Sequence, residues 1–249
     1  MIYWHLCPAQ DCANSGAARP DFLSASERRA YAALRFPKRR HEWLLGRWTA
    51  KQLLQQSLEP YRGLPLPAIS VNADPDGAPY LSVDGEGRLP ASLSISHRSG
   101  RAFCALSPGV SPSIGADIER IEPRAAAFVN DFFTKTEADR VWACPQAARD
   151  TLVTVIWSAK EAVLKALREG LRMDTRSVEV GQVPGIEIPA LAATQEPHPS
   201  TAMKRVGDGA SDLQWQPIAV ACSAPGVLRY AAWWRPEGDS VLTMAAAWP

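Results

Sequence analysis

The stretch Trp157-Ser-Ala-Lys160-Glu161-Ala-Val-Leu-Lys165-Ala decides the fold of the second half of the chain. Trp157, Glu161 and Lys165 follow one another at four-residue intervals, so a helix places them on one face, with the glutamate one turn before the lysine. Apolar residues form another face of the same helix: Val155, Ile156, Ala159, Val163, Leu164 and Leu167. The sequence therefore predicts a buried helix over about residues 146–169, ended by Gly170, that presents an acid and a base.

The segment Gly115-Ala-Asp117-Ile-Glu119 predicts a strand in an apolar setting. Residues two apart on a strand point to the same face about 6.6 Å apart. Two ionised carboxylates at that distance repel by about 2.5 kcal/mol at an effective dielectric constant of about 20, so a cation must lie near them. Two interpretations stay open here. Glu161 faces the pair and the three hold Mg²⁺ together with a phosphate group, or the pair makes structural salt bridges to Arg120, Arg124 or Lys165.

The composition excludes several classes of function. The 249 residues include 27 lysines and arginines against 26 aspartates and glutamates, which argues against general binding to nucleic acid or to a membrane. The five cysteines form no Cys-x-x-Cys pair and fit neither a disulfide framework nor a zinc site. Because no targeting segment and no long apolar run is found, we expect a soluble protein in the reducing cytoplasm.

Positive charge concentrates around one predicted helix, from about residue 38 to residue 56. The basic residues in and before it are Arg28, Arg29, Lys38, Arg39, Arg40, Arg47 and Lys51. A charge run on helices is more often a solvated face than a binding site, and this alternative stays open. Gly46 in mid-helix costs about 1 kcal/mol relative to alanine, so we expect a close approach to the backbone there.

Period-two alternation predicts a β-hairpin from residues 93–97 and 102–106. Ser96 and His97 end its first strand and offer two donors to an anion, although a lone histidine there is more often structural. The Pro/Gly/Ser-rich linker over 107–113 predicts a boundary between subdomains of residues 1–110 and 111–249.

The remaining signals complete the predicted elements. Thr134-Lys-Thr-Glu137 predicts a capping box, in which Glu137 satisfies its own helix. Residues 184–209 read as a surface loop, and the segments 213–222, 228–234 and 241–248 read as an antiparallel meander. We find no clear internal sequence repeat.

Taken together, the motifs resemble those of the Sfp-type 4′-phosphopantetheinyl transferases. They occur in the family's order over most of the chain: Gly46-Arg47, Gly77-x-Pro79, Ser94-Ile-Ser96-His97, Gly115-x-Asp117-Ile-Glu119, Phe132-Phe133-Thr-x-x-Glu137 and Trp157-x-x-Lys160-Glu161-Ala-x-x-Lys165-Ala. Any one of these motifs is weak, whereas six in order are strong and favour the metal-binding interpretation.

The resemblance implies an α+β fold of two similar subdomains related by a pseudo-twofold axis, with the active site in the cleft between them. It implies a monomer that moves the phosphopantetheine arm of coenzyme A to a serine of an apo acyl or peptidyl carrier protein, with Mg²⁺ as cofactor. By the resemblance, Asp117, Glu119 and Glu161 hold Mg²⁺. Lys165 and His97 bind the pyrophosphate.

Further roles follow from the same resemblance. Ser96 with Arg28 or Arg29 holds the 3′-phosphate. Arg47 and the turn from Gly77 to Pro79 line the nucleotide. Glu161 is the expected base for the serine proton, directly or through a metal-bound water.

The chain departs from the family pattern at two positions. Ala78 stands where the family often has lysine, so a cationic phosphate contact is missing unless a neighbouring basic residue replaces it. Arg168 stands where a glycine often follows Lys-Ala-x, which puts in doubt a close backbone approach at that turn.

Two other functions remain as alternatives. One is a different metal-dependent enzyme that cleaves pyrophosphate with an activated water. The other is a non-catalytic module that binds nucleotides or carrier proteins, in which the three carboxylates are structural.

Overall fold

The computed structural model describes residues 1–8, 20–186, 201–206, 214–223 and 229–248. The chain forms two compact units, the first from residues 1–111 and 201–210 and the second from residues 112–200 and 211–249. The boundaries expected from the sequence, 1–110 and 111–249, differ from these mainly in residues 201–210. Those residues belong to the first unit because the short strand β9 (Met203–Arg205) pairs in parallel with β1 (Ile2–Pro8).

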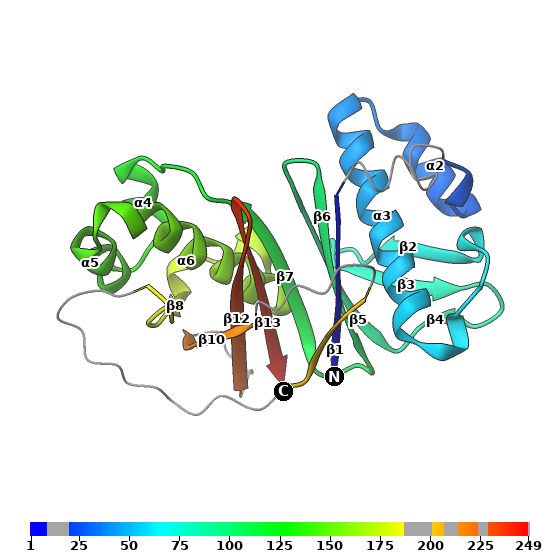
Figure 1. Cartoon of the computed structure of the whole chain (residues 1–249). Helices are drawn as coiled ribbons and strands as arrows, with labels where there is room; N and C mark the ends of the chain where they lie inside the picture. The colour runs from blue at the N-terminus through cyan, green and yellow to red at the C-terminus, as the bar shows by residue number, and fades with distance from the viewer. Residues whose placement is uncertain (9–19, 187–200, 207–213, 224–228, 249) are drawn as a thin grey trace. The chain divides into compact units, whose positions relative to one another are not determined.

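The first unit packs two α-helices and a small sheet against a larger sheet (Figure 1). Its larger sheet has the strand order β5-β6-β1-β9, and its small sheet has the order β2-β3-β4. The elements are η1 (Pro20–Phe22), α2 (Ala25–Ala33), α3 (Pro37–Ser57), η2 (Glu59–Tyr61), η3 (Leu66–Ala68), β2 (Ile69–Ala73), β3 (Pro79–Val83), β4 (Gly87–Arg88), β5 (Ala91–Arg98) and β6 (Arg101–Pro108). The predicted hairpin is confirmed as β5 and β6, which pair antiparallel.

In the second unit α6 lies along one face of the sheet, α5 packs on α6, and α4 packs on α5 (Figure 1). The sheet has the strand order β10-β12-β13-β7, and β11 pairs with β8 in a separate two-stranded sheet. The elements are β7 (Ser113–Arg120), α4 (Ala126–Phe132), α5 (Lys135–Ala143), α6 (Gln146–Ala166), η4 (Gly170–Arg172), η5 (Thr175–Ser177), β8 (Val178–Val180), β10 (Gln216–Ile218), β11 (Val220–Cys222), β12 (Arg229–Glu237) and β13 (Ser240–Trp248). The mixed helix and sheet of both units confirm the α+β class.

Two predictions for the C-terminal half need correction. The predicted meander is confirmed for β10, β12 and β13, which pair antiparallel in that order, and it is wrong at the end of its first segment, because β11 leaves the sheet to pair with β8. The predicted surface loop over 184–209 is wrong at β9, which is a strand, while residues 187–200 and 207–209 lie outside the described residues.

The two units share one topology. In each unit the first strand pairs antiparallel with the second strand of an antiparallel hairpin: β1 with the hairpin β5–β6 in the first unit, and β7 with the hairpin β12–β13 in the second. In each, a short helix and then a long helix follow the first strand, α2 and α3 in one unit and α5 and α6 in the other.

A buried lysine–glutamate pair repeats in both units and joins the short helix to the long one. In the first unit Lys51 Nζ lies 2.6 Å from Glu27 Oε2, and in the second Lys160 Nζ lies 2.8 Å from Glu137 Oε2. Each glutamate also completes a capping box at the start of its short helix, which confirms the predicted cap at Glu137. Burial lowers the pKa of both lysines, and the charge of the paired glutamate opposes that shift.

Each glutamate also accepts a backbone N–H from the small strand that follows the long helix. Glu27 Oε1 accepts from Val71 N at 2.9 Å, and Glu137 Oε1 accepts from Val180 N at 2.7 Å. The structure thus reveals a repeat, in which Trp48-Thr-Ala-Lys51 matches Trp157-Ser-Ala-Lys160. The sequence search missed it because the matching residues are few and scattered.

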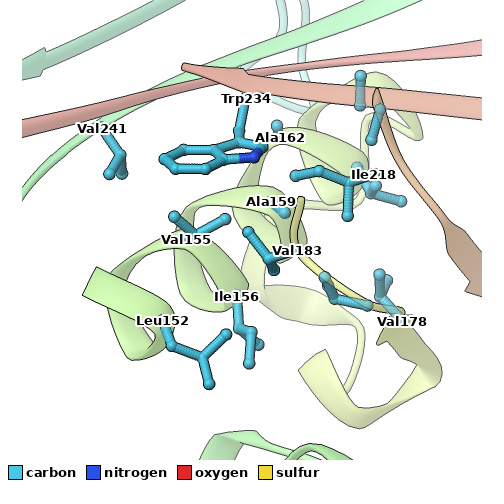
Figure 2. Packing of buried hydrophobic residues seen from close by; sticks show 14 of the residues in the cluster. Leu152, Val155, Ile156, Ala159, Ala162, Val178, Val183, Ile218, Trp234 and Val241 are labelled. Carbon is cyan, nitrogen blue, oxygen red and sulfur yellow. The ribbon is translucent and has the colours of Figure 1, made fainter. Parts of the chain in front are cut away.

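The core of the second unit lies between α6 and the strands around it. Figure 2 shows Leu152, Val155, Ile156 and Ala159 of α6 facing the same cluster as Trp234 of β12. This is the apolar face predicted for the helix, and it fixes which face of α6 remains for polar residues.

No helix in the described part of the chain is long and apolar enough to cross a membrane. The four cysteines within it, Cys7, Cys104, Cys144 and Cys222, carry free thiols.

Candidate functional site

Close contact between α6 and β7 creates the site in the second unit. A Cβ atom at Gly115 of β7 would lie 1.8 Å from the carbonyl oxygen of Ala162 and 2.8 Å from the amide nitrogen of Ala166. Only glycine leaves room for this approach. The approach brings Asp117 and Glu119, farther along β7, under Glu161 and Lys165 of α6.

Both carboxylate oxygens of Asp117 accept hydrogen bonds. Lys165 Nζ lies 2.6 Å from Asp117 Oδ1 and also donates to the Ala116 carbonyl oxygen at 3.2 Å. Ser158 Oγ donates to Asp117 Oδ2 at 2.8 Å. Asp117 is only 4% exposed, so these contacts hold an ionised carboxylate inside the unit.

Glu119 pairs with a cation of the following loop. Arg124 Nη2 lies 3.4 Å from Glu119 Oε2 and 3.2 Å from Glu122 Oε1. Arg120 instead pairs with Asp239 at 3.2 Å. Of the salt bridges considered from the sequence, those to Lys165 and Arg124 are therefore present.

Glu161 is the member of the group whose ionised form is disfavoured by burial. Its Oε1 atom is buried and has no hydrogen-bond partner among the described residues. Burial raises the pKa of its carboxyl group; the charge of Lys165 opposes the rise, and the charges of Asp117 and Glu119 add to it. The three carboxylates thus act on one another electrostatically.

The donor atoms are not gathered as a finished metal site. Within the described ranges no group of three or more His, Cys, Asp or Glu side chains is arranged to hold an ion. The chemistry nevertheless fits Mg²⁺, because three carboxylates are hard oxygen ligands and one buried oxygen of Glu161 lacks a partner. Lys165 already provides one positive charge at Asp117 Oδ1.

An aromatic wall adjoins the acidic group. Trp157 lies one turn before Glu161 on α6, and its ring centroid is 5.0 Å from that of Phe128 and 5.1 Å from that of Phe132. The Arg124 guanidinium lies 5.1 Å from the Phe128 ring centroid. The wall therefore links the start of α4 to the carboxylates, a role that sequence spacing did not reveal for Phe128.

Lys160 and Glu137 of the family motifs lie outside this group. Both side chains are 0% exposed and bind each other, so they hold α5 to α6 and are not available to an ion or substrate. The sequence analysis missed two polar residues beside Asp117, Ser158 and Thr243. Only the pairing of β13 with β7 places Thr243 opposite Asp117.

The remaining predicted residues lie in the first unit. Arg47 of α3 stacks its guanidinium 3.7 Å from the Trp43 ring centroid, and its buried Nε atom has no hydrogen-bond partner in the described part of the chain. Burial lowers the pKa of Arg47 to about 10; the charge of Glu27 opposes this fall, and that of Arg39 adds to it. A half-buried guanidinium with an unpartnered Nε suits an anionic ligand.

Ser96 and His97 lie on β5, which packs directly on α3. A Cβ at Gly46 would lie 3.1 Å from Ile95 Cγ2, which accounts for the close approach predicted there. Because side chains alternate along a strand, His97 shares the face of Ile95 toward α3, whereas Ser96 points to the other face of the sheet. His97 Nδ1 lies 3.9 Å from Glu42 Oε2 of α3, and Ser96 is buried.

Arg28 and Arg29 lie on the exposed side of α2. Arg28 Nη1 donates to the Leu23 carbonyl oxygen at 2.9 Å, which fixes its guanidinium near the start of the helix. The structure thus leaves the side chain of Arg29 in contact with solvent.

The turn from Gly77 to Pro79 depends on a left-handed glycine. Gly77 has φ of 91°, and its N–H donates to the Asp74 carbonyl oxygen at 2.8 Å. Arg88 binds both carboxylate oxygens of Asp74, at 2.8 and 2.9 Å, and lies 4.1 Å from the Tyr80 ring centroid. A cation therefore lies beside the turn in which Ala78 replaces lysine.

Comparison with a family model supports the resemblance. Residues 113–212 match the family model described as the 4′-phosphopantetheinyl transferase superfamily. Over this part of the chain the match confirms the resemblance read from the motifs.

Individual relatives agree with the assignment. The 4′-phosphopantetheinyl transferase HetI of Nostoc sp. is 25% identical over 151 residues, which cover 60% of this chain and 61% of that protein. The chain thus matches less than two thirds of that relative.

Solved structures of holo-[acyl-carrier-protein] synthases also match. The Helicobacter pylori enzyme in complex with coenzyme A has a TM-score of 0.34 and 19% identity, over 43% of this chain and 97% of that one. The apo-ACPS structure of Chronobacterium ammoiniagenes has a TM-score of 0.34 and 26% identity, over 43% of this chain and 93% of that one.

Proposed function

We propose that this protein is a Mg²⁺-dependent 4′-phosphopantetheinyl transferase that converts an apo acyl or peptidyl carrier protein to its holo form. The observation that carries the proposal is the electrostatic group of Asp117, Glu119, Glu161 and Lys165 inside the domain that matches the superfamily. In the reaction, the serine Oγ of the carrier bonds to the β-phosphorus of coenzyme A. The bond from that phosphorus to the bridging oxygen breaks, and adenosine 3′,5′-bisphosphate leaves.

Asp117, Glu119 and Glu161 would hold the Mg²⁺ ion, which supplies positive charge against the pyrophosphate of the coenzyme. The buried, unpartnered Oε1 of Glu161 supports this assignment.

Lys165, besides its contact with Asp117, would offset negative charge on the departing phosphate oxygen. Its ammonium group has one further N–H donor besides those used for Asp117 and Ala116. Phosphoryl transfer depends chiefly on such positioned charge, so Lys165 would act on the leaving group, with His97 as a second donor.

Glu161 would accept the serine proton, directly or through a water.

The first unit would bind the rest of coenzyme A. Arg47 carries a half-buried guanidinium, whose buried Nε has no partner among the described residues, and this supports a phosphate or nucleotide contact. Ser96, with Arg28 or Arg29, would hold the 3′-phosphate. The turn from Gly77 to Pro79 would line the nucleotide, with Arg88 as the cation beside it.

The proposal includes a monomer in the cytoplasm. Free thiols at the described cysteines support a reducing location.

Intact-mass measurement tests the activity. An apo carrier protein incubated with the protein, coenzyme A and Mg²⁺ should gain the mass of one phosphopantetheine group. Loss of coenzyme A without a carrier would instead indicate a pyrophosphate-cleaving hydrolase, and no reaction with any carrier would indicate a binding module.

Variants test the roles. Asp117→Ala and Glu161→Ala should abolish transfer at saturating coenzyme A while the protein stays folded, and near-normal turnover would contradict the metal assignment. Lys165→Ala should lower kcat more than it raises KM for coenzyme A, because its charge matters most as the phosphate departs. A change in KM alone would make Lys165 only a binding residue.

A further inference from the structure

Two hydroxyl groups, those of Ser158 and Thr243, lie behind the Asp117 carboxylate. Ser158 Oγ is 2.8 Å from Asp117 Oδ2 and 2.8 Å from Thr243 Oγ1. Thr243 Oγ1 also lies 2.9 Å from the Ser158 carbonyl oxygen. Both residues are 0% exposed, although the interface between α6 and the sheet is otherwise largely apolar.

The number of hydroxyl hydrogens fixes the direction of these hydrogen bonds. An ionised Asp117 can only accept, so the single hydroxyl hydrogen of Ser158 points at Asp117 Oδ2. The hydrogen of Thr243 then points at the oxygen or the backbone carbonyl of Ser158. In either case Thr243 orients Ser158, and Ser158 orients Asp117.

The first unit offers a comparison, because the matching hydroxyl group there binds a backbone carbonyl and not a carboxylate. Thr49 of α3 stands at the position that matches Ser158 in the repeat, and its hydroxyl donates to the Leu45 carbonyl oxygen of its own helix at 2.8 Å. A buried hydroxyl at this helix position can therefore satisfy itself locally. In α6 the hydroxyl is instead directed across to the sheet.

We propose that Ser158 and Thr243 are positioning residues that fix the Asp117 carboxylate, with Oδ1 turned toward Lys165 and the ion. The inference rests on the proposed function, because it concerns the ion-binding role of Asp117. Groups that orient a metal ligand typically change metal affinity by about 10- to 100-fold when they are removed.

The test measures ion binding and does not depend on turnover. Free Mn²⁺ is followed by electron paramagnetic resonance during titration of the full chain with saturating coenzyme A and no carrier protein. Ser158→Ala and Thr243→Val should each weaken Mn²⁺ binding by about 10- to 100-fold. Ser158→Thr and Thr243→Ser keep the hydroxyl groups and should bind Mn²⁺ nearly as the unmodified protein does.

Thr154→Val is the matched control. Thr154 is also buried on α6, and its hydroxyl donates to the Asp150 carbonyl oxygen at 2.7 Å, away from Asp117. This variant should lose a similar amount of thermal stability and no Mn²⁺ affinity.

The outcomes separate the two proposals. If the unmodified protein binds Mn²⁺ and the Ser158→Ala and Thr243→Val variants bind it equally well, the positioning role is wrong and the proposed function stands. If Thr154→Val weakens binding as much as they do, the effect comes from packing and the positioning role is also wrong. If the unmodified protein binds no Mn²⁺, the metal assignment in the proposed function fails and takes this inference with it.

Discussion

Replacing Glu161 with glutamine should make the metal-free protein more stable while it abolishes transfer. The Oε1 atom of Glu161 is buried without a partner in the described part of the chain. Burial raises the pKa of this carboxyl group; Lys165 opposes the rise, and Asp117 and Glu119 add to it. The folded protein therefore disfavours the ionised side chain, and glutamine removes the charge with little change of shape.

The gain comes from removing the charge, because glutamine keeps the unpartnered oxygen. A pKa difference of one between the folded and unfolded states corresponds to about 1.4 kcal/mol. For a protein of this size each kcal/mol moves the thermal midpoint by about 2 to 4 °C, so each such difference removed by Glu161→Gln should raise the midpoint by about 3 to 6 °C.

The sign of the pH dependence is fixed by the raised pKa. A carboxyl group with a higher pKa in the folded state than in the unfolded state destabilises folding only when it is ionised. The gain from Glu161→Gln should therefore vanish near pH 4, below the ordinary carboxyl pKa of about 4.3. The gain in stability should grow as the pH rises from the unfolded-state pKa to the folded-state pKa of Glu161, and it should stay constant at higher pH.

Thermal midpoints of both proteins between pH 4 and pH 8, with a chelator present, test the prediction. Glu169→Gln is a suitable control, because Glu169 lies just beyond α6 and has a half-exposed side chain paired with Arg172. Added Mg²⁺ should stabilise the unmodified protein and not the Glu161→Gln variant. A variant that is less stable than the unmodified protein at pH 8, or equally stabilised at pH 4, would refute the reasoning.

Three further predictions concern the framework. Lys160→Met should destabilise the protein by about 3 to 5 kcal/mol because it leaves Glu137 charged and buried, and adding Glu137→Gln should recover most of the loss in urea titrations. Gly115→Ala should cost more than the usual 1 to 3 kcal/mol or so of overpacking, because its Cβ would lie 1.8 Å from a backbone oxygen; Gly46→Ala, where the nearest atom is a side chain at 3.1 Å, should lower the thermal midpoint less. Arg168→Gly should stabilise by about 1 kcal/mol in the same assay, because Arg168 has φ of 62°, whereas Arg168→Ala should bring no gain.

Local sequence signals predicted the start of the long helix α6 well and the turn after it less well. The helix begins at Gln146 as expected, but it ends at Ala166, before the predicted stop at Gly170. Arg168 itself takes the left-handed conformation, and the N–H of Glu169 donates to the Leu164 carbonyl oxygen at 3.0 Å. An arginine at the position that favours glycine gives no sequence signal for the end of a helix.

The site shows where sequence reasoning stops. The spacing of Asp117 with Glu119, and of Glu161 with Lys165, is local, so their faces could be predicted from strand and helix periodicity. Thr243 joins the site only through the register of β13 against β7, which pairs it with Asp117. Strand register between distant segments depends on packing across the sheet, and no local pattern encodes it.

The repeat separates residues that build the fold from residues that serve chemistry. Lys51 and Lys160 occupy matching positions on the two long helices and hold matching glutamates, so the buried pair belongs to the framework of each unit.

One position after each lysine the units diverge. The first unit has Gln52 where the second has Glu161, and Gln56 where the second has Lys165. Gln56 Nε2 donates to Gln52 Oε1 at 3.1 Å in a neutral, exposed contact. In the second unit the same two positions carry opposite charges and lie over two carboxylates. Since one framework accepts either pair, the fold does not require the charges of Glu161 and Lys165, and their presence in the second unit alone points to ion and phosphate chemistry.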